Sequence, residues 1–288
     1  MKKYIFKEDD QHKGEFPQWI ESIAHVCENP LWQFCFHRHL DKVDITFIKS
    51  GKGEYAIGNR WIPVSAGDLI ILKPGVIHAI RSSEDNPIDL WILAFTQFDK
   101  ALQIIEFNED PFRHASAYYG NNQAAAAVGL LIESTAYQRE IDNSRSYINH
   151  CLELSILNAL TIFFSQSDIF PLVENNYVAD GAIAFIDDHY SNQVSLATLS
   201  RVLHVSSSCI SHEMSSYYST SPIKSLINRR IGRAQWLLAT TNMSFTNIAR
   251  NVGYDNLTHF TNLFLKRAGM SPREFRDRFH EENQIKRQ

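Results

Sequence analysis

Three histidines and one aspartate in the first third of the chain have residue types and spacing that could bind a metal. His37 and His39 are two residues apart, Asp44 follows shortly, and His78 comes later. Residues i and i+2 of a strand point to the same face, so the first two imidazoles could act together. Three imidazoles and a carboxylate suit zinc, iron or manganese, and an open coordination position would permit catalysis. The alternative is that these histidines are simply buried and hydrogen-bonded.

Two segments near the C-terminus repeat one arrangement of residues. Ile210–Met214 and Phe260–Phe264 lie 50 residues apart. In each copy a short helix is followed by a tight turn, an N-capping residue (Ser206 or Asp255) and a second helix. This order predicts two helix-turn-helix units in tandem, which is a far more specific signal than one unit.

The second helix of each unit could enter the major groove of DNA and read base edges. Asn can pair with adenine through two hydrogen bonds, Ser and Thr can donate or accept, and Leu can touch a thymine methyl group. The apolar positions of these helices should be buried, namely Ile210, Met214, Phe260 and Phe264. The predicted DNA-binding set is Ser207, Ser208, Ser211, His212, Leu257, Thr258, Thr261, Asn262, Lys266 and, on the helix between the units, Arg230.

The elements that must position the histidine set follow a strand pattern. Between residues 31 and 97, short apolar or alternating runs are separated by turns rich in Gly, Pro, Asn and Asp, which is typical of a sandwich or small barrel. The expected strands cover 43–48, 54–57, 61–64, 69–72, 76–80 and 89–95. The first 30 residues lie outside this pattern and are expected to form a polar arm.

From about residue 98 the pattern becomes helical. Helices are expected at 123–139 and 147–165, then at 181–190, 196–203, 207–217, 222–238, 245–252, 257–268 and 272–279. The helix at 147–165 has an apolar stripe that we predict packs on both the barrel and a partner subunit: Ile148, Leu152, Ile156, Ala159 and Phe163. The expected domains are 1–168 and 179–288, with a linker at 169–178.

Composition narrows the class of protein. Apolar residues make up 44% of the chain, enough for buried cores. The net charge of −4 hides a basic segment at 221–288, with 12 Lys and Arg against 5 Asp and Glu, as expected where a chain meets a polyanion. Four scattered cysteines predict reduced thiols. No apolar run reaches the ~18 residues of a membrane span, and charges interrupt the first ten residues, so we expect a cytoplasmic protein without a signal peptide.

The second repeat, together with the helix before it, carries a family resemblance. Gly253–Phe264 and Gly269–Arg276 resemble the signature of the AraC/XylS family of bacterial transcription regulators, and Arg230-Ile231, Ala234 and Leu237-Leu238 match that family's connecting helix. The resemblance is close over 178–280 and looser elsewhere. It implies DNA binding through two helix-turn-helix units, usually in activators that respond to a small molecule.

This chain departs from the family pattern at four positions. His212 and Asn262 stand where members often carry Arg, and Ser215 and Leu265 stand where they often carry Lys. The missing cations should weaken attraction to phosphate. The first unit lies in the acidic segment 171–220, with 1 Arg against 5 Asp and Glu, and should therefore contribute less electrostatic binding than the second.

The N-terminal half is similar to the cupin pattern, through His37-Arg38-His39, Asp44, Gly51, Gly67-Asp68 and Pro74–His78. In metal-binding cupins the three histidines and a carboxylate converge inside the barrel, but Asp44 is shorter than the usual Glu. Sensor barrels of this regulator family generally lack metal and hold a small effector instead. We therefore predict no metal, no cofactor, and an effector pocket lined by residues drawn from His37, Arg38, His39, Asp44, Tyr55 and His78.

The expected fold is α+β and multidomain, with an N-terminal cupin-like β-barrel, flanking helices and a C-terminal all-α domain of seven helices containing both helix-turn-helix units. The expected function is that of a transcription regulator, an activator rather than an enzyme, responding to a sugar or related metabolite. Expected partners are double-stranded promoter DNA, a small-molecule effector, RNA polymerase and a second copy of the chain. The alternatives are a metal-dependent cupin enzyme and an effector-independent DNA binder.

Overall fold

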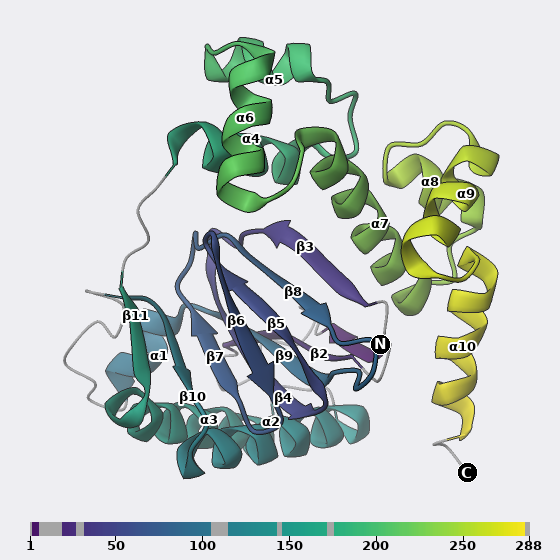
Figure 1. The fold of residues 1–288 in the computed structure, drawn as a ribbon. Helices are drawn as coiled ribbons and strands as arrows, with labels where there is room; N and C mark the ends of the chain where they lie inside the picture. Colours follow the sequence, from purple (N-terminus) through teal and green to yellow (C-terminus); the bar gives the residue numbers. More distant parts are fainter. Residues whose placement is uncertain are drawn as a thin grey trace.

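A computed structural model describes residues 2–5, 19–26, 32–104, 115–142, 146–171 and 176–285 of the chain. It has a sheet-rich N-terminal half and a helical C-terminal half (Figure 1). The strands are β1 (Lys2–Ile5), β2 (Ile20–Val26), β3 (Gln33–His37), β4 (Lys42–Ser50), β5 (Lys52–Ile57), β6 (Arg60–Ser65), β7 (Leu69–Leu72), β8 (His78–Ser82), β9 (Asp89–Thr96), β10 (Ala115–Gly120) and β11 (Asp168–Pro171). The helices of this half are α1 (Phe98–Ile104), α2 (Gln123–Ile141) and α3 (Tyr147–Gln166).

The strands form two antiparallel sheets, as the cupin-like prediction requires. One sheet has the order β1-β2-β9-β4-β7-β10-β11 and the other the order β3-β8-β5-β6. The hairpin between β5 and β6 turns at Gly58, whose φ of 58° lies in the left-handed region that favours glycine. Along β4, alternation sends Ile45 and Phe47 to the outer helices and Ile48 to the interior between the sheets.

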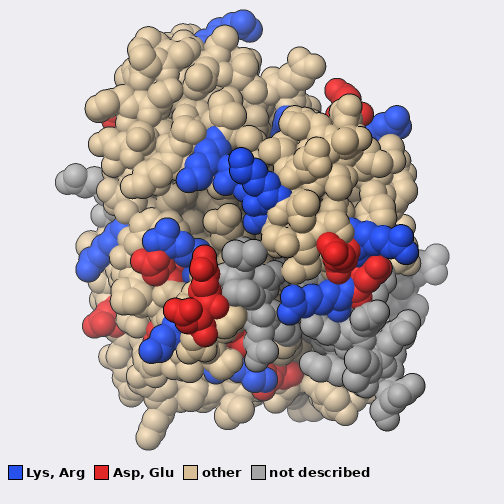
Figure 2. Space-filling model, turned by 45° about the vertical axis from the view of Figure 1, so that its right-hand side comes forward, with Lys and Arg blue, Asp and Glu red and all other residues tan. Residues whose placement is uncertain are grey.

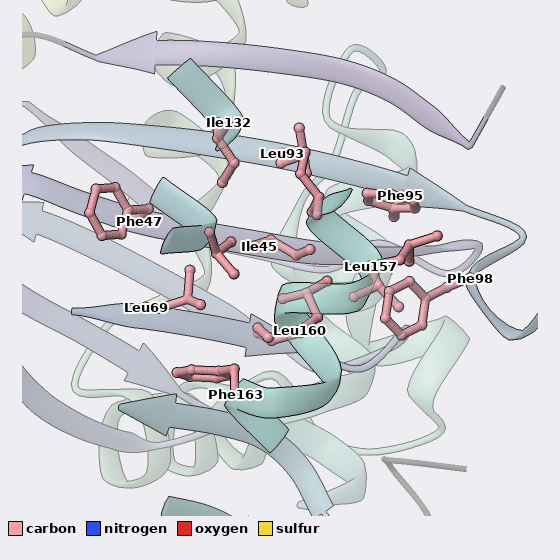
Figure 3. Packing of buried hydrophobic residues seen from close by; sticks show 14 of the residues in the cluster. Ile45, Phe47, Leu69, Leu93, Phe95, Phe98, Ile132, Leu157, Leu160 and Phe163 are labelled. Atoms are coloured by element: carbon pink, nitrogen blue, oxygen red, sulfur yellow. The ribbon is translucent and has the colours of Figure 1, made fainter. Parts of the chain in front are cut away.

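The outer face of the larger sheet is covered by α2 and α3, which lie below it in Figure 1. Figure 3 shows the resulting core, with Leu93 and Phe95 of the sheet facing Leu157 and Leu160 of α3. Gly129 of α2 is required here because a Cβ at this position would lie 2.3 Å from the ring of Phe47. Close packing of this layer fixes β4 and β9, which form one wall of the barrel.

The expected boundaries of the sheet region were wrong at both ends. Within the first 30 residues, 20–26 form β2, which pairs with β9 in the middle of the larger sheet instead of belonging to an arm. Beyond residue 98, β10 and β11 add two more strands. The local pattern does not reveal these strands because their pairing partners lie far away in sequence; Ile20, for example, pairs with Phe95.

The C-terminal half is helical throughout its described length, as predicted. Its helices are α4 (Tyr177–His189), α5 (Leu196–Leu203), α6 (Ser207–Tyr218), α7 (Pro222–Thr240), α8 (Phe245–Asn251), α9 (Leu257–Ala268) and α10 (Pro272–Ile285). In Figure 1, α4 to α6 lie above the barrel and α8 to α10 to its right, with α7 running between the two groups. Of the linker expected at 169–178, β11 takes the start and α4 the end; 172–175 lie outside the described residues.

Helix α3 is long and apolar enough to cross a membrane by length and composition alone. In this structure it is a core helix, because Ile156, Leu160 and Phe163 are fully buried against the sheet and its neighbours. The same helix buries Glu153, which pairs with Arg139 of α2 and accepts a hydrogen bond from the backbone N–H of Trp19 at 3.0 Å. This ion pair therefore ties α2, α3 and the start of β2 together.

Replacing Arg139 with Met should lower the free energy of unfolding by about 3–5 kcal/mol, because the Glu153 carboxylate then remains buried without its cation. The double variant Arg139→Met/Glu153→Leu should recover much of that loss, since neither charge is left behind. Denaturant unfolding measures both. A loss below about 1 kcal/mol in the single variant would contradict a structural role for the pair.

Candidate DNA-binding and effector sites

Two helix-turn-helix units, α5–α6 and α8–α9, are joined by α7. In the first, the turn passes through His204 in the left-handed region (φ 56°), and the Ser206 side chain caps α6 by accepting from the backbone N–H of Cys209. In the second, Gly253 makes the turn (φ 86°). Its cap is Asn256 and not the expected Asp255, because the Asn256 Oδ1 accepts from the backbone N–H of His259 at 2.9 Å.

The second helix of each unit presents the predicted polar face. Its apolar positions Ile210, Met214, Phe260 and Phe264 are fully buried, as predicted. The exposed members of the predicted DNA-binding set are Ser208, His212, Leu257, Thr258, Asn262 and Lys266. Ser207, Ser211 and Thr261 are half-buried, and the Ser211 hydroxyl donates to the carbonyl of Ser207. The exposed residues are therefore the ones available to a duplex.

Arg230 of α7 is occupied within the protein. Its Nε donates to the carbonyl of Tyr190 and its terminal nitrogen to the carbonyl of Asn192, each at 2.7 Å. Its guanidinium also lies over the ring of Tyr254, 5.0 Å from the centroid. Arg230 thus joins the loop after α4 to the turn of the second unit. These contacts favour a role for Arg230 as an anchor within the protein over the DNA contact predicted from the sequence.

The charge on the surface is uneven. On the face shown in Figure 2, Lys and Arg side chains gather toward the middle of the view, and Asp and Glu lie mostly in its lower half. By composition, 221–288 is basic and the rest of the chain is more acidic. A polyanion would be attracted to the helical half more than to the barrel.

The histidine set comes together inside the barrel. His37 at the end of β3 pairs in register with His78 at the start of β8, and His39 follows in the next loop. One ring nitrogen from each of the three lies within 4.8 Å of the others. Asp44 reaches them from β4 of the opposite sheet, with its Oδ2 3.3 Å from the Nε2 of His39 and 3.8 Å from that of His78. This cluster could hold a metal ion.

Burial controls the protonation of this cluster. Desolvation lowers the pKa of His78 to about 4, and the pKa of His37 falls well below its ordinary value through desolvation and the neighbouring histidines. Burial would raise the pKa of Asp44, but the hydrogen bond from His39 and the nearby imidazoles outweigh it and lower that pKa. The interior thus favours neutral imidazoles at His37 and His78 facing a carboxylate, a donor set without excess protons.

Tyr55 lies beside the cluster, next to His78. Its ring is stacked on that of His78 at 6.2 Å between centroids, and its hydroxyl is 3.4 Å from the Thr46 hydroxyl. Five members of the predicted effector set (His37, His39, Asp44, Tyr55 and His78) therefore lie together, and only Arg38 points elsewhere, toward the helical half.

A cavity of about 520 Å³ lies between the barrel and the first helix-turn-helix unit. The barrel contributes Arg38, Lys73 and Val76 among its lining residues, whereas α4 contributes Asp180 and α6 contributes Tyr217. Of the predicted effector residues, Arg38 lines this cavity. The cavity is large enough for a small organic molecule and carries both charges and aromatic rings for polar and apolar contacts.

Sequence reasoning missed the residues that join the two halves. Asp187 of α4 accepts from the backbone N–H of Arg38 at 3.2 Å and from the guanidinium of Arg229 on α7. Phe36 of β3 packs against the ring of Tyr218 on α6 at 4.6 Å. No sequence signal could have found these pairs, because contacts between residues about 150 positions apart leave no local pattern.

Each half of the chain matches a model of a known protein family. A family model described as a helix-turn-helix domain matches residues 199–278, and one described as a cupin domain matches residues 26–94. The chain is 33% identical over 234 residues to the arabinose operon regulatory protein of Salmonella typhimurium, covering 78% of this chain and 80% of that protein. It is 24% identical over 265 residues to the transcriptional activator RhaS of an Enterobacter species, covering 91% and 94%.

A solved structure shares the whole fold. Apo ToxT from Vibrio cholerae aligns with a TM-score of 0.53 over 91% of this chain and 98% of its own, at 14% sequence identity. This likeness shows that a sheet-rich domain followed by a helical domain with paired helix-turn-helix units is an arrangement found in another protein. It confirms the predicted fold class.

Arg230→Met should lower the free energy of unfolding by about 1.5–3 kcal/mol, because two charged hydrogen bonds to backbone carbonyls are lost. The salt dependence of DNA binding should stay unchanged if Arg230 contacts no phosphate. Lys266→Met is the matched control, and should leave stability unchanged while reducing the salt slope by about one ion. An Arg230→Met protein with wild-type stability and a flatter slope would reverse the assignment.

Proposed function

We propose, from the premise that this chain belongs to the AraC/XylS family of bacterial transcription regulators, that it binds promoter DNA under the control of a small-molecule effector. The observation that carries the proposal is the pair of capped recognition helices, α6 and α9, held apart by one long helix and exposing polar side chains. The names of the relatives above are those of regulators, which supports a protein that is not an enzyme.

The DNA contact is divided between the two recognition helices. Helix α9 offers Thr258 and Asn262 to base edges and Lys266 to phosphate, whereas α6 offers Ser208 and His212, without a fixed positive charge. The second unit therefore supplies more of the sequence-independent attraction. Two helices spaced about one duplex turn apart would read successive major grooves on one side of the DNA.

The effector site of this proposal is the cavity between the barrel and the first unit. Its walls include Tyr217 at the inner side of α6, so a bound molecule touches the reverse of a recognition helix. A ligand shifts a conformational equilibrium only through unequal affinity for the two states. A cavity shared by two domains meets this condition, because a change in their relative position alters its shape. We further propose that the protein activates transcription, contacts RNA polymerase and is located in the cytoplasm.

A homodimer is part of the proposal, with a revised interface. Of the predicted stripe, Ile156 and Phe163 are buried in the core of their own chain, since the helix needs them to cover the sheet. The large apolar side chains that α2 and α3 leave exposed are Ile148, which belongs to that stripe, and five that lie outside it: Leu130, Tyr137, Ile141, Tyr147 and Ile162. They lie on the layer of helices farthest from α4 to α6 in Figure 1, so pairing there would leave the recognition helices free.

Asn262→Ala and Thr258→Ala should each relax base preference in one half of the DNA site. On a duplex selected from a random pool by the wild-type protein, loss of a bidentate contact from Asn262 should cost about 1–3 kcal/mol of binding free energy, and much less on random DNA. Asn242→Ala, an exposed asparagine outside the recognition helices, is the control. Fluorescence anisotropy measures the affinities. Equal losses on both duplexes would contradict base reading.

Ile148→Glu combined with Ile162→Glu should give a folded monomer that binds the selected duplex more weakly, because two of the three large apolar side chains that α3 exposes acquire charge. Asn158→Glu, an exposed polar position on the same helix, should stay dimeric. Sedimentation velocity at micromolar concentration gives the oligomeric state. A wild-type protein that is monomeric with and without DNA would end this part of the proposal.

A further inference from the structure

We propose that the cavity between the barrel and the first helix-turn-helix unit binds an amino acid, a molecule that carries both an ammonium and a carboxylate group. This inference rests on the proposed function, because it takes that cavity as the effector site and names the class of effector. The sequence led us to expect a sugar or related metabolite. The charges on the two walls of the cavity favour a zwitterionic molecule instead.

The two walls of the cavity carry opposite charges. Lys73, directly after β7, and Arg38 belong to the barrel wall, whereas Asp180 in the first turn of α4 belongs to the helical wall. The helices α4 and α6 lie above the barrel in Figure 1. A molecule in the cavity therefore has cations on its barrel side and a carboxylate on its helical side.

One of the two cations is already matched within the protein. The guanidinium of Arg38 is 3.6 Å from the carboxylate of Asp188, and its backbone N–H donates to Asp187. Lys73 and Asp180, by contrast, form no ion pair with any other residue that the structure describes. The cavity thus has one cation and one anion without an ionic partner, on opposite walls.

The carboxylate of Asp180 is held in place and partly removed from water. Burial raises its pKa, although the hydrogen bond that it accepts from the Tyr218 hydroxyl at 2.5 Å opposes the rise. An ammonium group in the cavity would offset the cost of this burial. A favourable interaction with the N-terminus of α4 also accounts for a carboxylate at this position, but it leaves Lys73 on the opposite wall unexplained.

The rest of the lining provides room and apolar contacts for the body of the molecule. The volume of about 520 Å³ falls within the range of pockets that take small organic molecules. The rings of Tyr177 and Tyr217 and the side chain of Val76 can pack against an aliphatic or aromatic group. A sugar would leave both charged walls without a counter-charge, and a simple carboxylate or a simple amine would match only one of them.

An amino acid bound in this way would join the two halves through its two charged groups. Tyr218 ends α6 and bonds to Asp180, so the ammonium group would contact a hydrogen-bonded pair of the first helix-turn-helix unit. The backbone N–H of Lys73 donates to the carbonyl of Ser116 in β10, so the carboxylate would be held by the barrel. The affinity for the amino acid therefore depends on the relative position of the halves, as effector control requires.

Isothermal titration calorimetry on the full-length protein tests the class of ligand. The separate probes are the twenty standard amino acids, β-alanine, γ-aminobutyrate, ε-aminocaproate, glucose and arabinose. We expect at least one amino acid to bind. Its deaminated acid, which lacks the ammonium group, and its decarboxylated amine, which lacks the carboxylate, should each bind at least about tenfold more weakly, because each loses one charged contact.

Variants assign each charged group of the ligand to its wall. Lys73→Met should remove the preference for the amino acid over the amine, and Asp180→Asn should remove the preference over the deaminated acid. Lys52→Met and Asp85→Asn are matched controls at exposed positions that do not line the cavity, and they should bind like the wild type. Circular dichroism checks folding. The comparison of the three ligands on wild-type protein stays valid if Asp180→Asn does not fold.

The class would be overturned if no amino acid bound, or if a sugar or a singly charged analogue bound as tightly as the best amino acid. Folded Lys73→Met and Asp180→Asn proteins that keep both preferences would overturn the assignment of the walls. Affinity for the selected duplex tests the proposed function separately. A protein that binds the duplex but no amino acid contradicts only this inference, whereas one that binds an amino acid but no duplex contradicts the proposed function.

Discussion

Strand β3 links the two halves of the molecule, because one of its faces contributes to the barrel interior and the other contacts the helical half. One face places His37 in the barrel interior, and the other places Phe36 against Tyr218 of α6. Helix α7 packs along the same strand, where Arg229 and Asp187 surround Cys35. Burial raises the pKa of Cys35 to about 12, so its side chain stays a neutral thiol. β3 cannot shift without disturbing a site in each half.

This arrangement gives a physical route between ligand binding and DNA binding. Arg38 lines the proposed effector cavity, and it holds α4 through Asp187 and Asp188. Because coupling free energies are reciprocal, DNA bound to α6 and α9 must change the affinity of the barrel for its ligand by the same factor. Both the effector cavity and the DNA-binding surface can therefore act on β3 and on the contacts that hold β3 to α4.

The helical half could be predicted from sequence almost residue by residue, since caps such as Ser206 and the apolar period of α6 and α9 are local signals. The sequence predicted a barrel-like sheet fold for the N-terminal half, but it did not predict the strands β2 and β10, because the strands that they pair with lie far away in the sequence. The pattern of His37, His39 and His78 was visible, whereas the backbone carbonyls bonded to two of these rings, and the Asp44 oxygen without a hydrogen-bond partner among the described residues, required coordinates. Periodicity alone had assigned Thr258 and Thr261 to the same DNA-binding set, whereas in the structure Thr258 is exposed and Thr261 is half-buried.

The most direct measurement is a double-mutant cycle on DNA affinity with Arg38→Gln and Asp188→Asn, using the full-length protein and its selected duplex. The two side chains pair with each other across the contact between the halves, and neither residue lies on a recognition helix, so any coupling must pass through that contact. Coupling through β3 predicts that each single variant changes the Kd and that the two effects are non-additive by about 0.5–3 kcal/mol. Wild-type affinity in both single variants, or strictly additive effects, would contradict it.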